Sequence, residues 1–121
     1  MKVLIADDDP EQLAIRQMLL KHFGFEPIIA GDAQTALSAA ITERPACAVV
    51  DLRLPSEKSG LGLIRDLKRV DERVHILVLT GGSATRLDSL AERSLVDAVI
   101  EKGSPSAQLI ARLKAFEKGC R

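Results

Sequence analysis

Five side chains able to carry out chemistry each follow a short apolar run in this chain of 121 residues. They are Asp7, Asp8, Asp51, Thr80 and Lys102. Carboxylates that lie close together raise one another's pKa unless a cation joins them, and a hard divalent ion with oxygen ligands is the natural partner. If the three aspartates meet, they predict a magnesium site, and a bound ion lets such an acidic site accept a phosphoryl group.

Each of these residues then has a role in phosphoryl chemistry. Asp51 can attack phosphorus, because carboxylates form aspartyl phosphates. Lys102 can supply a positive charge for the phosphoryl oxygens, and Thr80 can supply a hydroxyl donor. Beyond positioning and charge neutralisation, phosphoryl transfer asks for little covalent chemistry from the protein. The residue types therefore favour phosphoryl transfer to Asp51.

Taken singly, each of these residues is more often structural. An aspartate after a strand is usually a turn former or a helix N-cap, as we expect for Asp9. A lysine near a strand end is usually solvated. Five chemically matched residues at the ends of four predicted strands are far less expected by chance, so the prediction rests on the set.

The elements that must position this set alternate strictly. Short, partly β-branched apolar runs predict buried strands at 2–6, 27–30, 46–50, 75–79 and 98–100. Helices are expected at about 10–23 and 33–43, after the loop 52–59, at about 84–94 and from Ser104-Pro105 onward. This alternation predicts a parallel α/β sheet with helices on both faces, whose chemistry lies at the carboxyl ends of the strands. In a strand order 2-1-3-4-5 the three aspartates would meet.

Helix signals add detail to this scheme. Asp9 is the expected N-cap of the first helix, Pro10 its first residue, and Gln12 the partner in a capping box. Its buried stripe is predicted to be Ile15, Leu19 and Phe23, with Gly24 ending the helix. In the second and last helices the predicted inward residues are Ala36, Leu37, Ala40, Ile41, Leu109, Ile110, Leu113 and Phe116.

Composition excludes several classes of function. Lys plus Arg and Asp plus Glu number 17 each, and three Phe are the only large aromatics, so neither a nucleic-acid surface nor base stacking is expected. No apolar run approaches the roughly 20 residues of a membrane span, which predicts a cytoplasmic protein. Cys47 and Cys120 are expected to be free thiols. His22 and His75 lack ligand neighbours at zinc spacing, and His22 is expected in the last turn of the first helix.

At this point the sequence resembles the CheY-like receiver domains of bacterial two-component response regulators. The matching segments are Val3–Pro10, Val49–Pro55, Leu79–Gly81 and Glu101-Lys102, which follow one another with nearly the family spacing. The resemblance covers the whole chain, so residues 1–121 are expected to form one receiver domain. It implies a doubly wound, flavodoxin-like (βα)5 three-layer sandwich. The strand order 2-1-3-4-5 is taken from this analogy.

The resemblance also implies a function. Asp51 would accept a phosphoryl group from a sensor histidine kinase or a histidine phosphotransfer protein, while Thr80 moves toward that group and Lys102 pairs with it. The Mg²⁺ ligands would be Asp7, Asp8, Asp51 and the backbone carbonyl of Arg53. A face made by the fourth helix, fifth strand and fifth helix would then be read by a downstream protein or an attached output domain. The domain would be a signalling switch that catalyses only its own phosphorylation and dephosphorylation.

Four features depart from the family pattern. Val99 stands where receivers usually carry an aromatic switch residue, and Lys102-Gly103 replaces the usual Lys-Pro. The segment Pro55–Gly60 is one residue longer than usual. Arg53 and Gly82 hold the two positions that flank the path of the attacking water. We expect Arg53 to project over the site and slow hydrolysis of the phosphoryl group.

Other functions remain open at this point. Val99 mildly favours a degenerate receiver that acts as a phosphorylation-independent interaction module, whereas the complete set of acidic residues, Thr80 and Lys102 disfavours it. A flavodoxin-like cofactor binder would need a phosphate-binding loop after the first strand, where three aspartates stand instead. A haloacid-dehalogenase-like phosphatase would need an aspartate at Arg53. Apolar residues on the last two helices are compatible with a homodimer or with core packing. The cognate kinase is not encoded in any motif.

Overall fold

The strands form a single parallel sheet in the order β2-β1-β3-β4-β5 in a computed structural model that describes residues 1–81 and 90–119. The strands are β1 (Lys2–Ala6), β2 (Glu26–Ala30), β3 (Cys47–Asp51), β4 (His75–Thr80) and β5 (Ala98–Glu101). The helices of the described residues are α1 (Pro10–His22), α2 (Ala33–Glu43), α3 (Glu57–Val70), the 3₁₀ helix η1 (Ala91–Leu95) and α5 (Ser106–Gly119). The predicted doubly wound, flavodoxin-like fold is confirmed.

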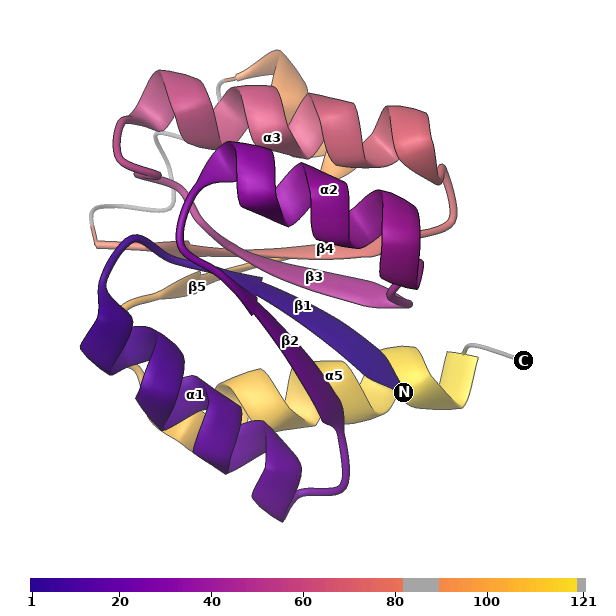
Figure 1. The fold of residues 1–121 in the computed structure, drawn as a ribbon. Coiled ribbons are helices and arrows are strands. Elements are labelled where there is room, and N and C mark those ends of the chain that lie inside the picture. Colours follow the sequence, from indigo (N-terminus) through magenta and orange to yellow (C-terminus); the bar gives the residue numbers. More distant parts are fainter. Residues whose placement is uncertain (82–89, 120–121) are drawn as a thin grey trace.

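The sheet is the middle of three layers (Figure 1), with α2 and α3 on one face and α1 and α5 on the other. Because side chains alternate along a strand, Leu4 and Ala48 pack toward α2 and α3, whereas Val3 and Val49 pack toward α1 and α5. All five residues of β3 are buried, as a central parallel strand requires. Its Cys47 is fully buried, and Cys120 lies outside the described residues.

Helix α1 begins as predicted but buries a different stripe. Asp9 is its N-cap and accepts a hydrogen bond from the Glu11 amide, and Pro10 is the first helical residue. The capping box with Gln12 is wrong, because the Gln12 side chain accepts a hydrogen bond from Arg16 instead. The predicted stripe is also wrong for two of its three members. Ile15 and Phe23 are 58% and 40% exposed, and the buried residues of α1 are Leu13 and Leu20.

Helix α2 has the predicted bounds, and Ala36 and Ala40 face the core. The predicted inward position of Ile41 is wrong, since this side chain is 54% exposed. One residue advances a helix by about 100°, so Ile41 points away from the stripe that Ala36 and Ala40 define. In α5 the predicted inward residues Leu109, Ile110 and Leu113 are buried, and Phe116 packs against them.

The prediction of one continuous helix at about 84–94 is wrong in its second half. Residues 82–89, Gly82 included, lie outside the described residues. Leu90 has extended backbone angles, and η1 begins only at Ala91. Side chains favour this short 3₁₀ form, because Ser94 Oγ donates to the Ala91 carbonyl and the Arg93 guanidinium donates to the Val96 carbonyl. No helix among residues 1–81 and 90–119 is long and apolar enough to cross a membrane.

Candidate functional site

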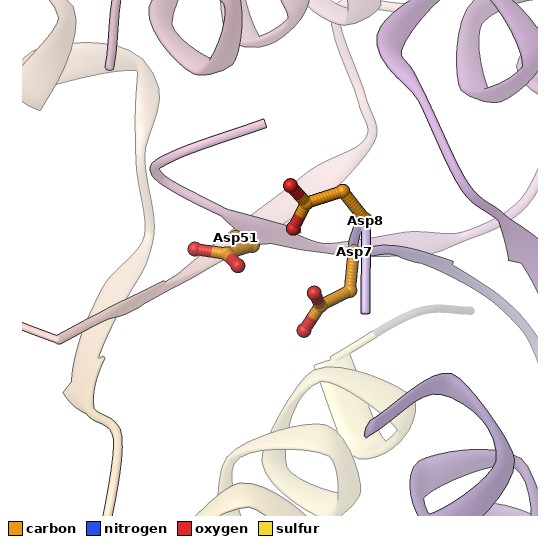
Figure 2. A group of neighbouring side chains, drawn as sticks. All are labelled: Asp7, Asp8 and Asp51. Atoms are coloured by element: carbon orange, nitrogen blue, oxygen red, sulfur yellow. The ribbon is translucent and has the colours of Figure 1, made fainter. Parts of the chain in front are cut away.

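Three carboxylates meet at the carboxyl ends of β1 and β3, as the sequence predicts (Figure 2). One oxygen each of Asp7, Asp8 and Asp51 lies within 4.8 Å of the others. The cause is the parallel register, in which Ala6 lies beside Val50, so the residues that follow them come side by side. Asp7 and Asp51 are buried at 0% and 4% exposure, while Asp8 is open to solvent.

This donor set fits a hard divalent ion. It offers only carboxylate oxygens, the ligand type that Mg²⁺ and Ca²⁺ prefer, and it has no thiol or imidazole among its members. The loop after β3 turns back on the site, because the Arg53 amide donates to Asp51 Oδ1 at 3.1 Å. The role of the Arg53 carbonyl as a metal ligand stays a prediction.

Lys102 reaches the carboxylates from the position directly after β5. Its Nζ lies 2.7 Å from Asp51 Oδ2 and 4.0 Å from Asp7 Oδ2, so it bridges the two buried aspartates. The Lys102 amide donates to the Thr80 carbonyl at 2.7 Å, which extends the pairing of β4 and β5 to this point. Gly103 then turns at a φ of +92°, an angle that the proline usual in the family pattern cannot adopt. The turn after Lys102 therefore differs from a Lys-Pro turn.

Thr80 and Val99 take up the positions that the strand pattern predicts. Thr80 is the last residue of β4 and is buried at 5% exposure, one residue beyond Leu79, which pairs with Asp51. Val99 is half-buried and packs into the core cluster beneath α2 and α3. The switch roles of both residues stay predictions.

Arg16 is a site residue that sequence reasoning missed. Its guanidinium makes a short, charge-assisted hydrogen bond to Asp7 Oδ2, and its side chain is only 12% exposed. Leu13, Arg16 and Leu20 share one stripe of α1 at helical spacing. A buried carboxylate requires a partner charge, and this pairing turns the stripe of Arg16 inward at the expense of Ile15. The sequence does carry a signal for this role of Arg16, since an arginine stands between two apolar residues of one helical stripe and near an aspartate cluster.

The pKa values of the two buried aspartates are displaced in opposite directions. Burial opposes ionisation of Asp7, but hydrogen bonds from the Asp9 amide and Arg16, together with the charges of Lys102 and Arg16, lower its pKa overall. Burial likewise opposes ionisation of Asp51, and there the hydrogen bond and charge of Lys102 offset only part of the effect, so its pKa is raised. The folded protein therefore favours the ionised form of Asp7 and disfavours the ionised form of Asp51.

These shifts predict opposite effects on folding. In metal-free protein at neutral pH, Asp7→Asn should lower the free energy of unfolding and Asp51→Asn should raise it. A lowered folded-state pKa gives stability that is lost as pH falls through that pKa. A raised pKa gives an unfavourable contribution that is present above it and disappears as pH falls through it. Both differences should therefore shrink on acidification. Urea unfolding in EDTA, followed by circular dichroism across pH, checks this, and shifts of the same sign would contradict it.

Comparison with known proteins points to one family. The sequence model of the response regulator receiver domain matches residues 3–114. The DNA-binding response regulator MtrA of Mycolicibacterium smegmatis is 32% identical over 114 residues, which cover 94% of this chain and 49% of that protein. The chain thus spans about half the length of this curated relative.

Solved structures share the fold. The receiver domain of the Francisella response regulator 1452 aligns with a TM-score of 0.88 at 23% identity, covering 99% of this chain and 98% of that one. The response regulator TrrA of Thermotoga maritima, solved in complex with Mg²⁺-BeF, aligns with a TM-score of 0.84 at 22% identity. That alignment covers 95% of this chain and 97% of the TrrA chain.

Proposed function

This chain belongs to the response regulator receiver domain family, whose members work in phosphorylation-based signalling, and on that premise we propose that Asp51 is its phosphoryl acceptor. The observation that carries the proposal is the 2.7 Å contact between Lys102 Nζ and Asp51 Oδ2 inside a cluster of three carboxylates. A nucleophile, its paired cation and further acidic ligands thus converge at one edge of the sheet. We take residues 1–121 as one receiver domain.

In the proposed reaction a carboxylate oxygen of Asp51 attacks the phosphorus of a phosphohistidine. The new O–P bond forms as the N–P bond breaks, and the bond electrons leave with the imidazole, which takes up a proton. Lys102 already donates a hydrogen bond to Asp51 and would then pair with a negatively charged phosphoryl oxygen. The Arg53 amide holds the other oxygen of Asp51 and so fixes the orientation of the carboxylate.

Asp7, Asp8 and Asp51 would hold the Mg²⁺ ion, with the Arg53 backbone carbonyl as a fourth protein ligand. When bound, the ion would neutralise the carboxylates and the phosphoryl oxygens during transfer. The oxygen-only donor set supports this assignment. So does the Mg²⁺-BeF complex of TrrA, a protein of the same fold.

The proposed partners are a sensor histidine kinase or a histidine phosphotransfer protein on the input side. On the output side, Thr80 and Val99 would pass the change to the face predicted from the fourth helix, the fifth strand and the fifth helix, of which β5 and α5 lie within the described residues. A downstream protein or an attached output domain would read that face, as the DNA-binding relative MtrA suggests. The receiver itself would not contact nucleic acid.

The decisive experiment is incubation with acetyl phosphate, with Mg²⁺ in one sample and EDTA in the other, followed by intact mass measurement. We expect a gain of one phosphoryl group only in the presence of Mg²⁺. No gain under either condition would overturn the proposal and leave a phosphorylation-independent interaction module as the function.

The exposed side chain of Arg53 is expected to slow loss of the phosphoryl group. Arg53 lies two residues beyond Asp51, its backbone amide donates to Asp51 Oδ1, and its side chain is open to solvent, so we propose that this side chain extends over the acceptor and obstructs an attacking water. Arg53→Asn should therefore shorten the phosphoryl half-life several-fold, up to about tenfold, equivalent to about 1.4 kcal/mol in the barrier. Decay of the phosphorylated mass after removal of acetyl phosphate measures this. An unchanged half-life would reject the role, and Arg73→Asn, in the loop before β4, serves as the control.

A further inference from the structure

Arg16 already occupies one of the carboxylates assigned to the metal. Asp7 Oδ2 accepts the short hydrogen bond from Arg16 Nη1 and lies 4.0 Å from Lys102 Nζ, while Asp7 Oδ1 accepts from the Asp9 amide at 2.9 Å. Both oxygens of Asp7 therefore have N–H donors. A cation that binds Asp7 meets a carboxylate that a guanidinium has already neutralised.

The charge balance of the site follows from this contact. Three carboxylates face two cations, Arg16 and Lys102, which leaves one net negative charge among these five groups. Without Arg16 the same site would carry two. Because like charges at contact distance repel, and Asp7 is fully buried, a bound divalent ion and the Arg16 guanidinium compete for Asp7.

A pocket with both polar and apolar lining lies beside Arg16 and offers room for its side chain. The pocket measures about 140 Å³ and opens between α1 and the turn that follows β5. Its polar lining includes Gln12, Ser104 and Ser106, and Lys102 also borders it. Gln12 Oε1 already accepts a hydrogen bond from Arg16 Nη2 at 3.4 Å, so part of the guanidinium contact is made on that side. Arg16 can thus leave Asp7 without losing every hydrogen-bond partner.

We propose that Arg16 is an internal counter-cation that competes with divalent ions for Asp7 and so weakens magnesium binding. This inference rests on the metal site of the proposed function. It assigns Arg16 a regulatory role, since the arginine stabilises Asp7 while the site is metal-free and must yield when the ion binds. It also links metal occupancy to the shape of the pocket between α1 and the β5–α5 turn.

Calorimetric titration of the metal-free protein with MgCl₂ at constant ionic strength tests the proposal. Arg16→Gln removes the charge but keeps a hydrogen-bonding side chain, and it should bind Mg²⁺ about tenfold more tightly, a gain of about 1.4 kcal/mol. Lys21→Gln removes the same charge from the exposed end of α1 and should change the affinity by less than about twofold. Unchanged or weaker binding by Arg16→Gln, or an equal gain in Lys21→Gln, would overturn the proposal.

Loss of the partner of a buried carboxylate can also destabilise the fold. Arg16→Met, whose unbranched side chain suits a helix, is the second neutral variant, and circular dichroism melts establish that each variant is folded. Both should show a larger Mg²⁺-induced rise in melting temperature than the parent chain. The acetyl phosphate assay on the parent chain is independent of this comparison. If the parent chain is phosphorylated but Arg16→Gln binds Mg²⁺ with the same affinity as the parent, the counter-cation role is rejected while the proposed function stands.

Discussion

Asp51→Asn is expected to abolish phosphoryl incorporation completely while leaving a folded protein. The substitution replaces the nucleophilic carboxylate by an amide of nearly the same shape, so the contacts of β3 are kept. It also removes a buried charge whose pKa is raised, so the variant should be more stable than the parent in metal-free buffer. Loss of the reaction together with a gain in stability separates a chemical role from a structural one.

Intact mass after incubation with acetyl phosphate and Mg²⁺ measures incorporation, and urea unfolding measures stability. Asp66→Asn is the matched control, because it makes the same change on an exposed position of α3 and should incorporate as the parent does. A phosphoryl gain that persists in Asp51→Asn would contradict the assignment. Asp8, which has an oxygen within 4.8 Å of Asp51, would then be the acceptor to test.

The carboxylate cluster was predictable because it depends on local signals. Each of its residues directly follows an apolar run, and parallel strands end at one edge of the sheet. The position of Lys102 follows from the same rule. The adjacency of β1 and β3 came from resemblance to the receiver family, since strand order depends on long-range packing that the pattern of one chain does not display.

The errors arise where a polar side-chain contact, and not the spacing of apolar residues, decides the local arrangement. The burial of Arg16 in place of Ile15 depends on the charge of Asp7, which lies nine residues earlier in the chain and follows the end of β1. In η1 the Arg93 guanidinium binds the Val96 carbonyl, a contact that apolar periodicity does not reveal. Hydrophobic spacing therefore located most elements but did not determine which stripe of α1 faces the site.

The close approach of α3 to the loop after β3 gives the second large prediction. Gly60 is buried in the first turns of α3, and a Cβ added there would lie 1.9 Å from the Leu52 carbonyl oxygen and 2.7 Å from its carbon. These are backbone atoms, which cannot rotate away as the end of a side chain can. Gly60→Ala should therefore destabilise the fold by about 3 kcal/mol, the upper end of the usual cost of overpacking.

Gly62 provides the matched control two residues along the same helix. A Cβ there would meet only the Arg65 side chain at 3.8 Å, so Gly62→Ala should stabilise the protein by about 0.5–1 kcal/mol through its better helix propensity. Urea unfolding followed by circular dichroism measures both. A loss below about 1 kcal/mol for Gly60→Ala would mean that the loop yields easily.

Whether the loop after β3 resists the added Cβ of Gly60→Ala or moves away from it also matters for the site. Leu52 directly follows Asp51, and the next amide, that of Arg53, donates to Asp51 Oδ1. A loop that moves away from an alanine at position 60 must therefore move the group that orients the acceptor. If Gly60→Ala folds, we expect its phosphoryl incorporation to fall well below that of Gly62→Ala at the same Mg²⁺ concentration. The packing of α3 against this loop would then be part of the apparatus that holds Asp51 in position.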